Sequence, residues 1–267
     1  MRITPAAQPW VSRIVRLGYV AKGVIYTLIG ALALRVAFRM RGGRLTDPSG
    51  VLLQIVRQPF GNLLLTIIGA AIVGYAAYYL FEAVADLRGK GRGVRAWLAR
   101  SLTMIKSLTY GIIGVQALRI VFVGDRPSSN PDRPVNAVMH LPFGWILVTV
   151  IGAGIAFYGL TQIDMAWKGR ADEDIDIGRV LREARWVLPL GRAGTAARGV
   201  ILVMIGIAMA LAGFHGRPSD ANGYRDVLRG LASTDPWLLA AMGAGLLCFG
   251  VYQLCHARYA RLPLHHA

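Results

Sequence analysis

A repeated spacing of basic residues and glycine divides the chain into three similar parts. In each part a basic residue is followed six positions later by a second one, and eight positions after that by a glycine. The three copies are Arg16, Lys22 and Gly30; Arg100, Lys106 and Gly114; and Arg192, Arg198 and Gly206. The copies start 84 and then 92 residues apart. Recurrence of this kind predicts a repeat architecture in which each copy is one supersecondary unit.

Each repeat contains two long apolar blocks. A helix needs about 20 mostly apolar residues to cross a bilayer. Six blocks reach this length, at 17–38, 61–85, 101–123, 143–167, 194–214 and 237–257. We therefore predict an all-α membrane protein, with six transmembrane helices forming three tandem helical hairpins within a single transmembrane domain, residues 1–267. The predicted repeats cover 12–86, 96–168 and 186–260.

The formal net charge of +16 allows two interpretations, a nucleic-acid partner or a membrane topology signal. Lys and Arg collect in cytoplasmic loops. The amino terminus, the tail and the loops 86–100 and 168–192 carry sixteen Lys or Arg, against nine in the other three loops. This favours topology, without a nucleic-acid partner and with both termini in the cytoplasm. The preference for Arg, Ala and Gly is typical of a GC-rich bacterium, so we expect the bacterial cytoplasmic membrane.

Three hairpins that each begin and end in the cytoplasm share one orientation, and parallel repeats are related by an axis along the membrane normal. A pseudo-three-fold ring is the expected closed arrangement. The outer loops of repeats one and three contain short amphipathic stretches, around Val51–Val56 and Tyr224–Leu231, which we place on the outer membrane surface. The second repeat has the polar run Ser128–Asp132 instead, for which we expect an irregular loop.

Lys22, Lys106 and Arg198 are the most informative residues, because each lies about 9 Å deeper than the basic residue that opens its repeat. A charge within the membrane is costly and usually functional. One interpretation is a basic ring on the cytoplasmic side that binds a lipid phosphate or another anion. The other is that the side chains snorkel to the interface and fix the topology.

Two acidic residues and three tyrosines accompany these cations. Glu82 and Asp164 are ion-pair candidates for Lys22 and Lys106, an arrangement that leaves Arg198 without an acidic partner. Tyrosines recur sixteen residues after the prolines of the outer loops, at Tyr75, Tyr158 and Tyr252. They are predicted either to line a ligand site or to anchor helix ends at the interface.

Signals for catalysis, metal binding and cofactor binding are absent from the sequence. It contains no nucleophile elbow, zinc-protease motif, P-loop or dinucleotide fingerprint. Two functions remain open. The first is a non-enzymatic protein that binds membrane lipids, anionic ones included, or assists another membrane protein. The alternative is a transporter or channel for a small solute or ion, with its path along the repeat axis.

Three segments carry a resemblance to a known family. They are RLGYVAKGVIYTLIGALAL in the first helix, the PFG at 59–61 and 142–144, and GVYQLCHARYARL near the end. Together they resemble the bacterial membrane family named domain of unknown function 1206, over about residues 12–262. The resemblance implies three tandem two-helix units and no established activity. The chain departs from the pattern at Ser107, where the other copies have glycine, and at Leu202, where they have tyrosine.

Overall fold

The computed structural model describes residues 8–85, 93–124, 132–169, 177–221 and 223–259, and the regular elements in these ranges are helices. The long helices are α1 (Gln8–Ala37), α3 (Gly61–Ala85), α4 (Val94–Phe122), α6 (Gly144–Trp167), α8 (Val187–His215) and α10 (Pro236–Tyr259). All six are long and apolar enough to cross a membrane, as predicted. The short helices are α2 (Pro48–Val56), α5 (Asp132–Met139), α7 (Ile177–Glu183), α9 (Tyr224–Thr234) and the 3-10 turn η2 (Pro218–Asp220).

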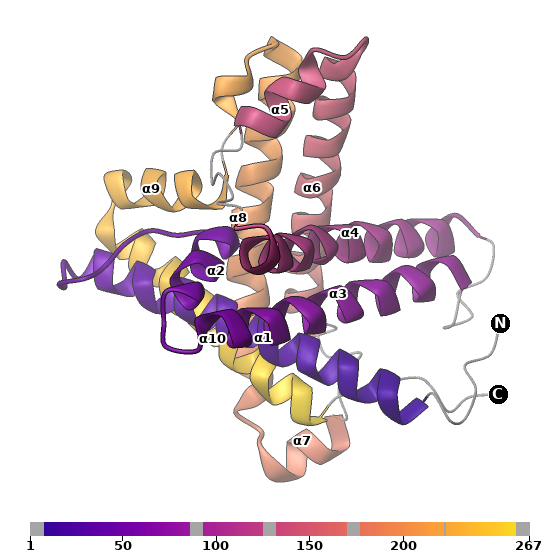
Figure 1. The fold of residues 1–267 in the computed structure, drawn as a ribbon, viewed down its shortest axis with the longest axis vertical. Coiled ribbons are helices and arrows are strands. Elements are labelled where there is room, and N and C mark those ends of the chain that lie inside the picture. The colour runs from indigo at the N-terminus through magenta and orange to yellow at the C-terminus, as the bar shows by residue number, and fades with distance from the viewer. Residues whose placement is uncertain (1–7, 86–92, 125–131, 170–176, 222, 260–267) are drawn as a thin grey trace.

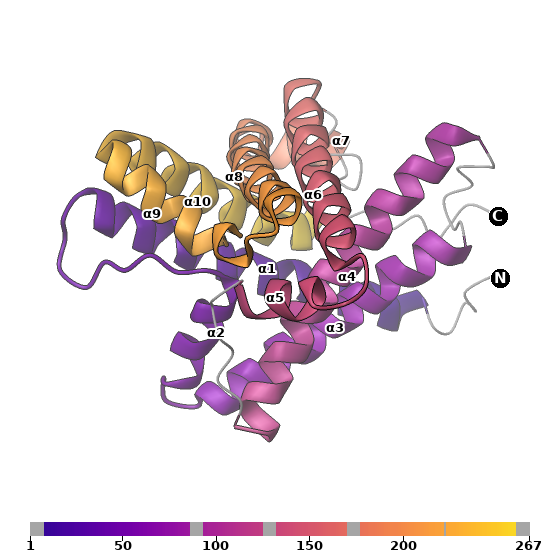
Figure 2. The same cartoon turned by 90° about the horizontal axis from the view of Figure 1, so that it is seen from above.

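The most extensive helix packing joins neighbouring repeats. The first helix of each repeat packs on the second helix of the preceding repeat, so α4 packs on α3 and α8 packs on α6, while α1 closes the ring on α10. Contacts within a repeat, between α1 and α3 and between α8 and α10, are less extensive. The three pairs run in clearly different directions (Figures 1 and 2). This cyclic order is one that the predicted pseudo-three-fold ring requires, and the symmetry itself stays a prediction.

Small residues seven positions apart make these pairs possible. Where glycine faces glycine, a Cβ atom would collide with the opposite backbone, as Gly30 would with Gly243 and Leu247. Close backbone approach of this kind is how helices associate in lipid. The facing pairs are Gly23 and Gly30 with Gly243 and Gly250, Gly199 and Gly206 with Gly152 and Gly159, and Ser107 and Gly114 with Gly69 and Ala76. Ser107, the departure from the repeat pattern, donates a hydrogen bond from its hydroxyl to the Ala76 carbonyl at 2.7 Å.

Arg100, the first basic residue of the second repeat, binds the C-terminal end of α3 in the first repeat. Arg100 donates hydrogen bonds to the carbonyls of Ala83 (2.7 Å) and Val84 (2.9 Å), in the last turn of α3. The final carbonyls of a helix have no partner within the helix, and they carry the negative end of its dipole. A cation at this position therefore stabilises the junction between the two repeats.

The outer loops form short helices in all three repeats. Repeats one and three contain the predicted amphipathic helices, α2 and α9, but Leu52 and Leu228 are fully buried against the protein. The expectation for the second repeat was wrong at its end, because α5 starts at Asp132 and buries Val135. Pro134 is compatible with this helix because the first-turn N–H groups have no helical partner. The rest of the predicted irregular loop lies outside the described residues.

The PFG motif forms a left-handed corner before the second helix of repeats one and two. Phe60 (φ 58°) and Phe143 (φ 61°) both have a left-handed backbone, and the helix begins at the glycine that follows. In the third repeat the helix begins at Pro236 itself. Positive φ is uncommon for a residue with a side chain. The motif therefore marks a tight change of direction between the outer loop and the helix.

Candidate functional site

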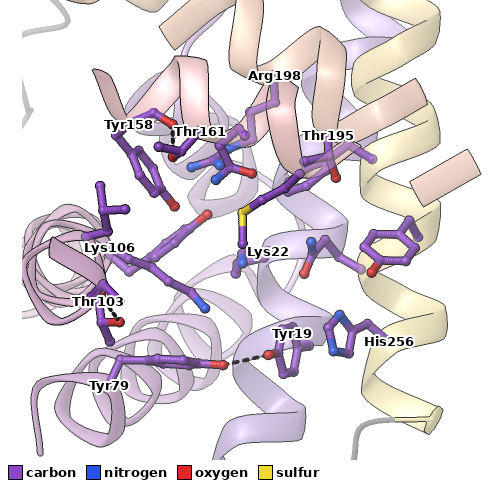
Figure 3. Close-up of a pocket in the computed structure, with 18 of the residues that line it drawn as sticks. Tyr19, Lys22, Tyr79, Thr103, Lys106, Tyr158, Thr161, Thr195, Arg198 and His256 are labelled. Atoms are coloured by element: carbon purple, nitrogen blue, oxygen red, sulfur yellow. Dashed lines mark hydrogen bonds between the residues drawn. The ribbon is translucent and has the colours of Figure 1, made fainter. Parts of the chain in front are cut away.

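A cavity of about 380 Å³ lies where the six long helices meet, and it contains the basic residues predicted from the repeats. Lys22 from α1, Lys106 from α4 and Arg198 from α8 point into it (Figure 3). The lining residues lie towards one end of every helix, the end formed by the starts of α1, α4 and α8 and the finishes of α3, α6 and α10. We call these the inner ends. They are the ends predicted to face the cytoplasm.

Lys22 is enclosed by aromatic rings and is only 4% exposed. Its Nζ donates a hydrogen bond to the Tyr75 hydroxyl at 3.1 Å and lies 4.5 Å from the centre of the Tyr110 ring. Cations are attracted to the faces of aromatic rings, by about 2 kcal/mol or more when water is excluded. This enclosure disagrees with the interpretation that Lys22 snorkels to the interface.

Arg198 is 3% exposed and is also held by aromatic residues. Its Nε donates to the Tyr26 hydroxyl at 3.1 Å, and its guanidinium carbon lies 5.3 Å from the Phe249 ring and 5.8 Å from the Tyr158 ring. Among the residues that the structure describes, no carboxylate forms an ion pair with Arg198 and none accepts a hydrogen bond from its two Nη groups. The sequence-based expectation that Arg198 lacks an acidic partner therefore agrees with the structure.

The third cation belongs to a cluster of rings at the inner edge of the cavity. Lys106 Nζ lies 3.6 Å from the centre of the Tyr79 ring. The Tyr79 hydroxyl shares a hydrogen bond of 2.7 Å with Tyr19, whose ring stacks on His256 at 4.1 Å. Side chains from α1, α3, α4 and α10 are thereby connected around Lys106, so its position depends on several repeats at once.

The remaining predicted residues have different positions. Tyr158 and Tyr252 line the cavity. Tyr75 is fully buried behind it, with its hydroxyl on Lys22. Burial of Tyr75 and Tyr252 disagrees with the interface-anchor interpretation. Glu82 lines the cavity at 4% exposure, whereas Asp164 is 53% exposed and pairs with Lys168 at 2.7 Å, one helical turn away.

Sequence reasoning missed the roles of Tyr26 and Tyr110. Each tyrosine follows a repeat cation by four positions, which places it one helical turn further from the inner end. The Tyr110 hydroxyl is buried and has no hydrogen-bond partner among the described residues, and the same holds for the side-chain oxygen of Gln253. Buried polar atoms in folded proteins are nearly always paired, so these two oxygens are exceptions among the residues that form the wall of the cavity.

The cavity has an excess of positive charge. Three cations line it, and Glu82 is the only carboxylate among the described lining residues. Of the residues described, no three His, Cys, Asp or Glu are grouped so as to hold a metal ion. Burying a charge is costly unless an opposite charge accompanies it. The arrangement therefore suits an anionic group with several acceptor oxygens.

The fold and cavity define a class: multi-pass membrane proteins built from three tandem two-helix repeats around a basic, aromatic cavity. The family described as Domain of Unknown Function (DUF1206) matches residues 17–86, 103–169 and 193–260, and the chain belongs to this family. The uncharacterized protein YxxB of Bacillus subtilis (strain 168) is 29% identical over 265 residues, which cover 98% of this chain and 95% of that protein. No solved structure gives a significant match.

Proposed function

We propose that this protein is a non-enzymatic membrane protein whose cavity binds a phosphate or carboxylate group through Lys22, Lys106 and Arg198. The observation that supports the proposal concerns Arg198. This residue is buried without an ion pair, and its Nη groups make no hydrogen bond to the described residues. A guanidinium presents a planar fork of donors that matches the oxygens of phosphate and carboxylate.

The electrostatics of the cavity support an anion over a neutral or cationic ligand. The lining cations repel each other, and Glu82 offsets one of their three charges. Aromatic faces lower the cost of burying each cation but add no net negative charge. An anion in the cavity would reduce this repulsion.

Binding is favoured over passage through the protein by the extent of the cavity. Among the described residues, no lining side chain comes from the outer third of its helix. A transporter needs a route to the other side, either in this state or in an alternative one. The closed outer part favours a binding site with access from the inner ends, so transport ranks second.

The proposal is tested by equilibrium binding to the purified protein in detergent. The probes are dioleoyl phosphatidylglycerol and sn-glycerol 1-phosphate, with dioleoyl phosphatidylcholine as the zwitterionic comparison. Replacement of Arg198 by Gln removes a charge-assisted interaction of about 1.5–3 kcal/mol. We expect affinity for the better anionic probe to fall about 10- to 100-fold, with little change for phosphatidylcholine.

The matched control is Arg185→Gln, which removes one charge near the same ends of the helices from an exposed position outside the cavity. It should leave binding of the anionic probes within about twofold, as expected for an exposed charge. Equal affinity of wild type and Arg198→Gln for both anions would contradict the proposed function.

A further inference from the structure

The wall of the cavity is closed on four helices and open on two. Lining residues from α1, α3, α8 and α10 are all buried, including Tyr19, Lys22, Glu82 and Arg198. On α4 and α6, Tyr110 is buried and the other lining residues are at least partly exposed. These are Ala99, Leu102, Thr103, Lys106, Tyr158, Thr161, Gln162 and Met165. The accessible side of the cavity therefore lies between α4 and α6.

This opening follows from the way the repeats pack. Helices α4 and α6 belong to the same repeat, but α4 packs on α3 and α6 packs on α8, with no more than marginal contact between α4 and α6 themselves. Both helices are membrane spans by length and composition. An opening between two spans faces the apolar part of a bilayer as well as its surface, so the cavity can be reached sideways.

The surfaces beside the opening are apolar. Leu102 on α4 and Met165 on α6 both line the cavity and are at least partly exposed, Met165 at 37%. A basic, aromatic interior thus continues into apolar helix faces. A ligand that matches both parts has an anionic group at one end and hydrocarbon at the other.

We infer that the ligand is a membrane lipid with an anionic headgroup, whose phosphate lies in the cavity while its acyl chains pass between α4 and α6 into the bilayer. This inference rests on the proposed function and specifies its ligand class. The phosphate oxygens would meet Arg198 and Lys106, and the chains would stay in hydrocarbon. A soluble anion would gain nothing from the apolar sides of the opening.

Competition with the wild-type protein separates the two ligand classes. Bound dioleoyl phosphatidylglycerol is challenged with sn-glycerol 1-phosphate, which has the headgroup glycerol, its phosphate as the more highly charged monoester, and no acyl chains. We expect displacement to need at least about 100-fold more of the soluble phosphate, because the chains add buried apolar surface. Displacement at equal concentration would overturn the lipid inference and leave the anion site standing.

A variant at the opening tests the lateral path. Thr161→Trp adds bulk at a partly exposed lining position of α6, and we expect affinity for phosphatidylglycerol to fall about tenfold while glycerol phosphate binding changes less. Val150→Trp, on an exposed position in the outer third of α6, is the control for added bulk and should bind as wild type does. Equal lipid binding by Thr161→Trp and wild type would contradict the lateral path.

Two further outcomes distinguish the failure of each idea. If Arg198→Gln binds both phosphatidylglycerol and glycerol phosphate as wild type does, the anion site and the lipid inference fail together. If native mass spectrometry shows a lipid-free dimer that Thr161→Trp separates into monomers, a second copy fills the opening and the lipid inference alone fails.

Discussion

The guanidinium of Arg198 is held by a hydroxyl and aromatic rings instead of a carboxylate. A carboxylate partner would stabilise the cation and also neutralise it. Tyr26 fixes the direction of the guanidinium through Nε and leaves its charge uncompensated. This kind of support orients a cation for a ligand without competing with that ligand for the charge.

The two tyrosines beside the cations should respond differently to loss of the hydroxyl. The Tyr110 hydroxyl has no partner among the described residues, so Tyr110→Phe should leave the unliganded protein as stable or about 1 kcal/mol more stable. Its affinity for phosphatidylglycerol should stay within about twofold of wild type, because the hydroxyl has almost no surface open to the cavity. Thermal unfolding and lipid binding measure the two effects.

Tyr26→Phe is the counterpart, because it removes the hydrogen bond to Arg198 Nε. We expect the free energy of unfolding to fall by about 1–3 kcal/mol as a buried donor loses its partner. A variant that loses neither stability nor affinity would show that Tyr26 does not position Arg198.

Equal spacing in the repeats was enough to predict that Lys22, Lys106 and Arg198 belong together. The partners of these residues were harder to predict. Asp164 pairs with Lys168 because a basic residue one helical turn away is always within reach. The aromatic enclosure of Lys22 involves α1, α3, α4 and α10, so it depends on packing between repeats, which no local pattern specifies.

At the scale of the helices, the pairs α1–α10, α3–α4 and α6–α8 pack through close backbone contacts at small residues. Spans that are apolar all round show no preferred face in their hydrophobic pattern, so the sequence predicts where they begin and end but not which helix each one meets. The positions of the glycines indicate which faces of the helices meet. Their seven-residue spacing recurs on both members of the α1–α10 and α6–α8 pairs.

Two glycines of α6, two positions apart, provide a direct test. A Cβ at Gly152 would collide with the backbone of Ala210 and Gly206, whereas a Cβ at Gly154 has nothing within 4 Å. Gly152→Ala should therefore destabilise the protein by about 1–3 kcal/mol. Gly154→Ala should be neutral or stabilising by up to about 1 kcal/mol, because alanine favours the helix. Thermal unfolding in detergent compares them, and similar values for both would argue against backbone packing of α6 on α8.

The cap of α2 allows a second comparison. The Asp47 carboxylate accepts a hydrogen bond of 2.8 Å from the Gly50 N–H. Burial raises the pKa of Asp47, and the Gly50 hydrogen bond offsets part of this shift. Asp47→Ala should lower the free energy of unfolding by about 1 kcal/mol. Asp47→Asn keeps an acceptor and should stay close to wild type at neutral pH.

A raised pKa also fixes the sign of the pH dependence. The contribution of Asp47 to stability is full below the unfolded-state pKa and decreases as pH rises through the higher folded-state value. The advantage of wild type over Asp47→Asn should therefore be greatest in acid and smaller at neutral pH. Unfolding temperatures of the two proteins across this range measure it, and an advantage that grows with pH would contradict the assignment.

For the whole molecule, the charge bias predicts that the inner ends face the cytoplasm. In a chain with Cys248 and Cys255 replaced by Ala, Arg57→Cys should react with a membrane-impermeant maleimide on intact cells. Arg185→Cys should react only after the cells are permeabilised. Both positions are exposed, so access alone decides the result. Labelling in the reverse pattern would invert the predicted topology.

The closure of the ring by α1 and α10 has a consequence for how the protein is made. Helices α4 and α8 meet partners that the ribosome has already synthesised, but α1 ends at Ala37 and its partner begins at Pro236. At about 5–20 residues per second, translation takes roughly 10–40 s to produce the intervening chain. Of the three helix pairs, α1 therefore has the longest interval before its partner is synthesised. A transcript truncated before α10 would produce a protein in which the glycine face of α1 has no partner helix.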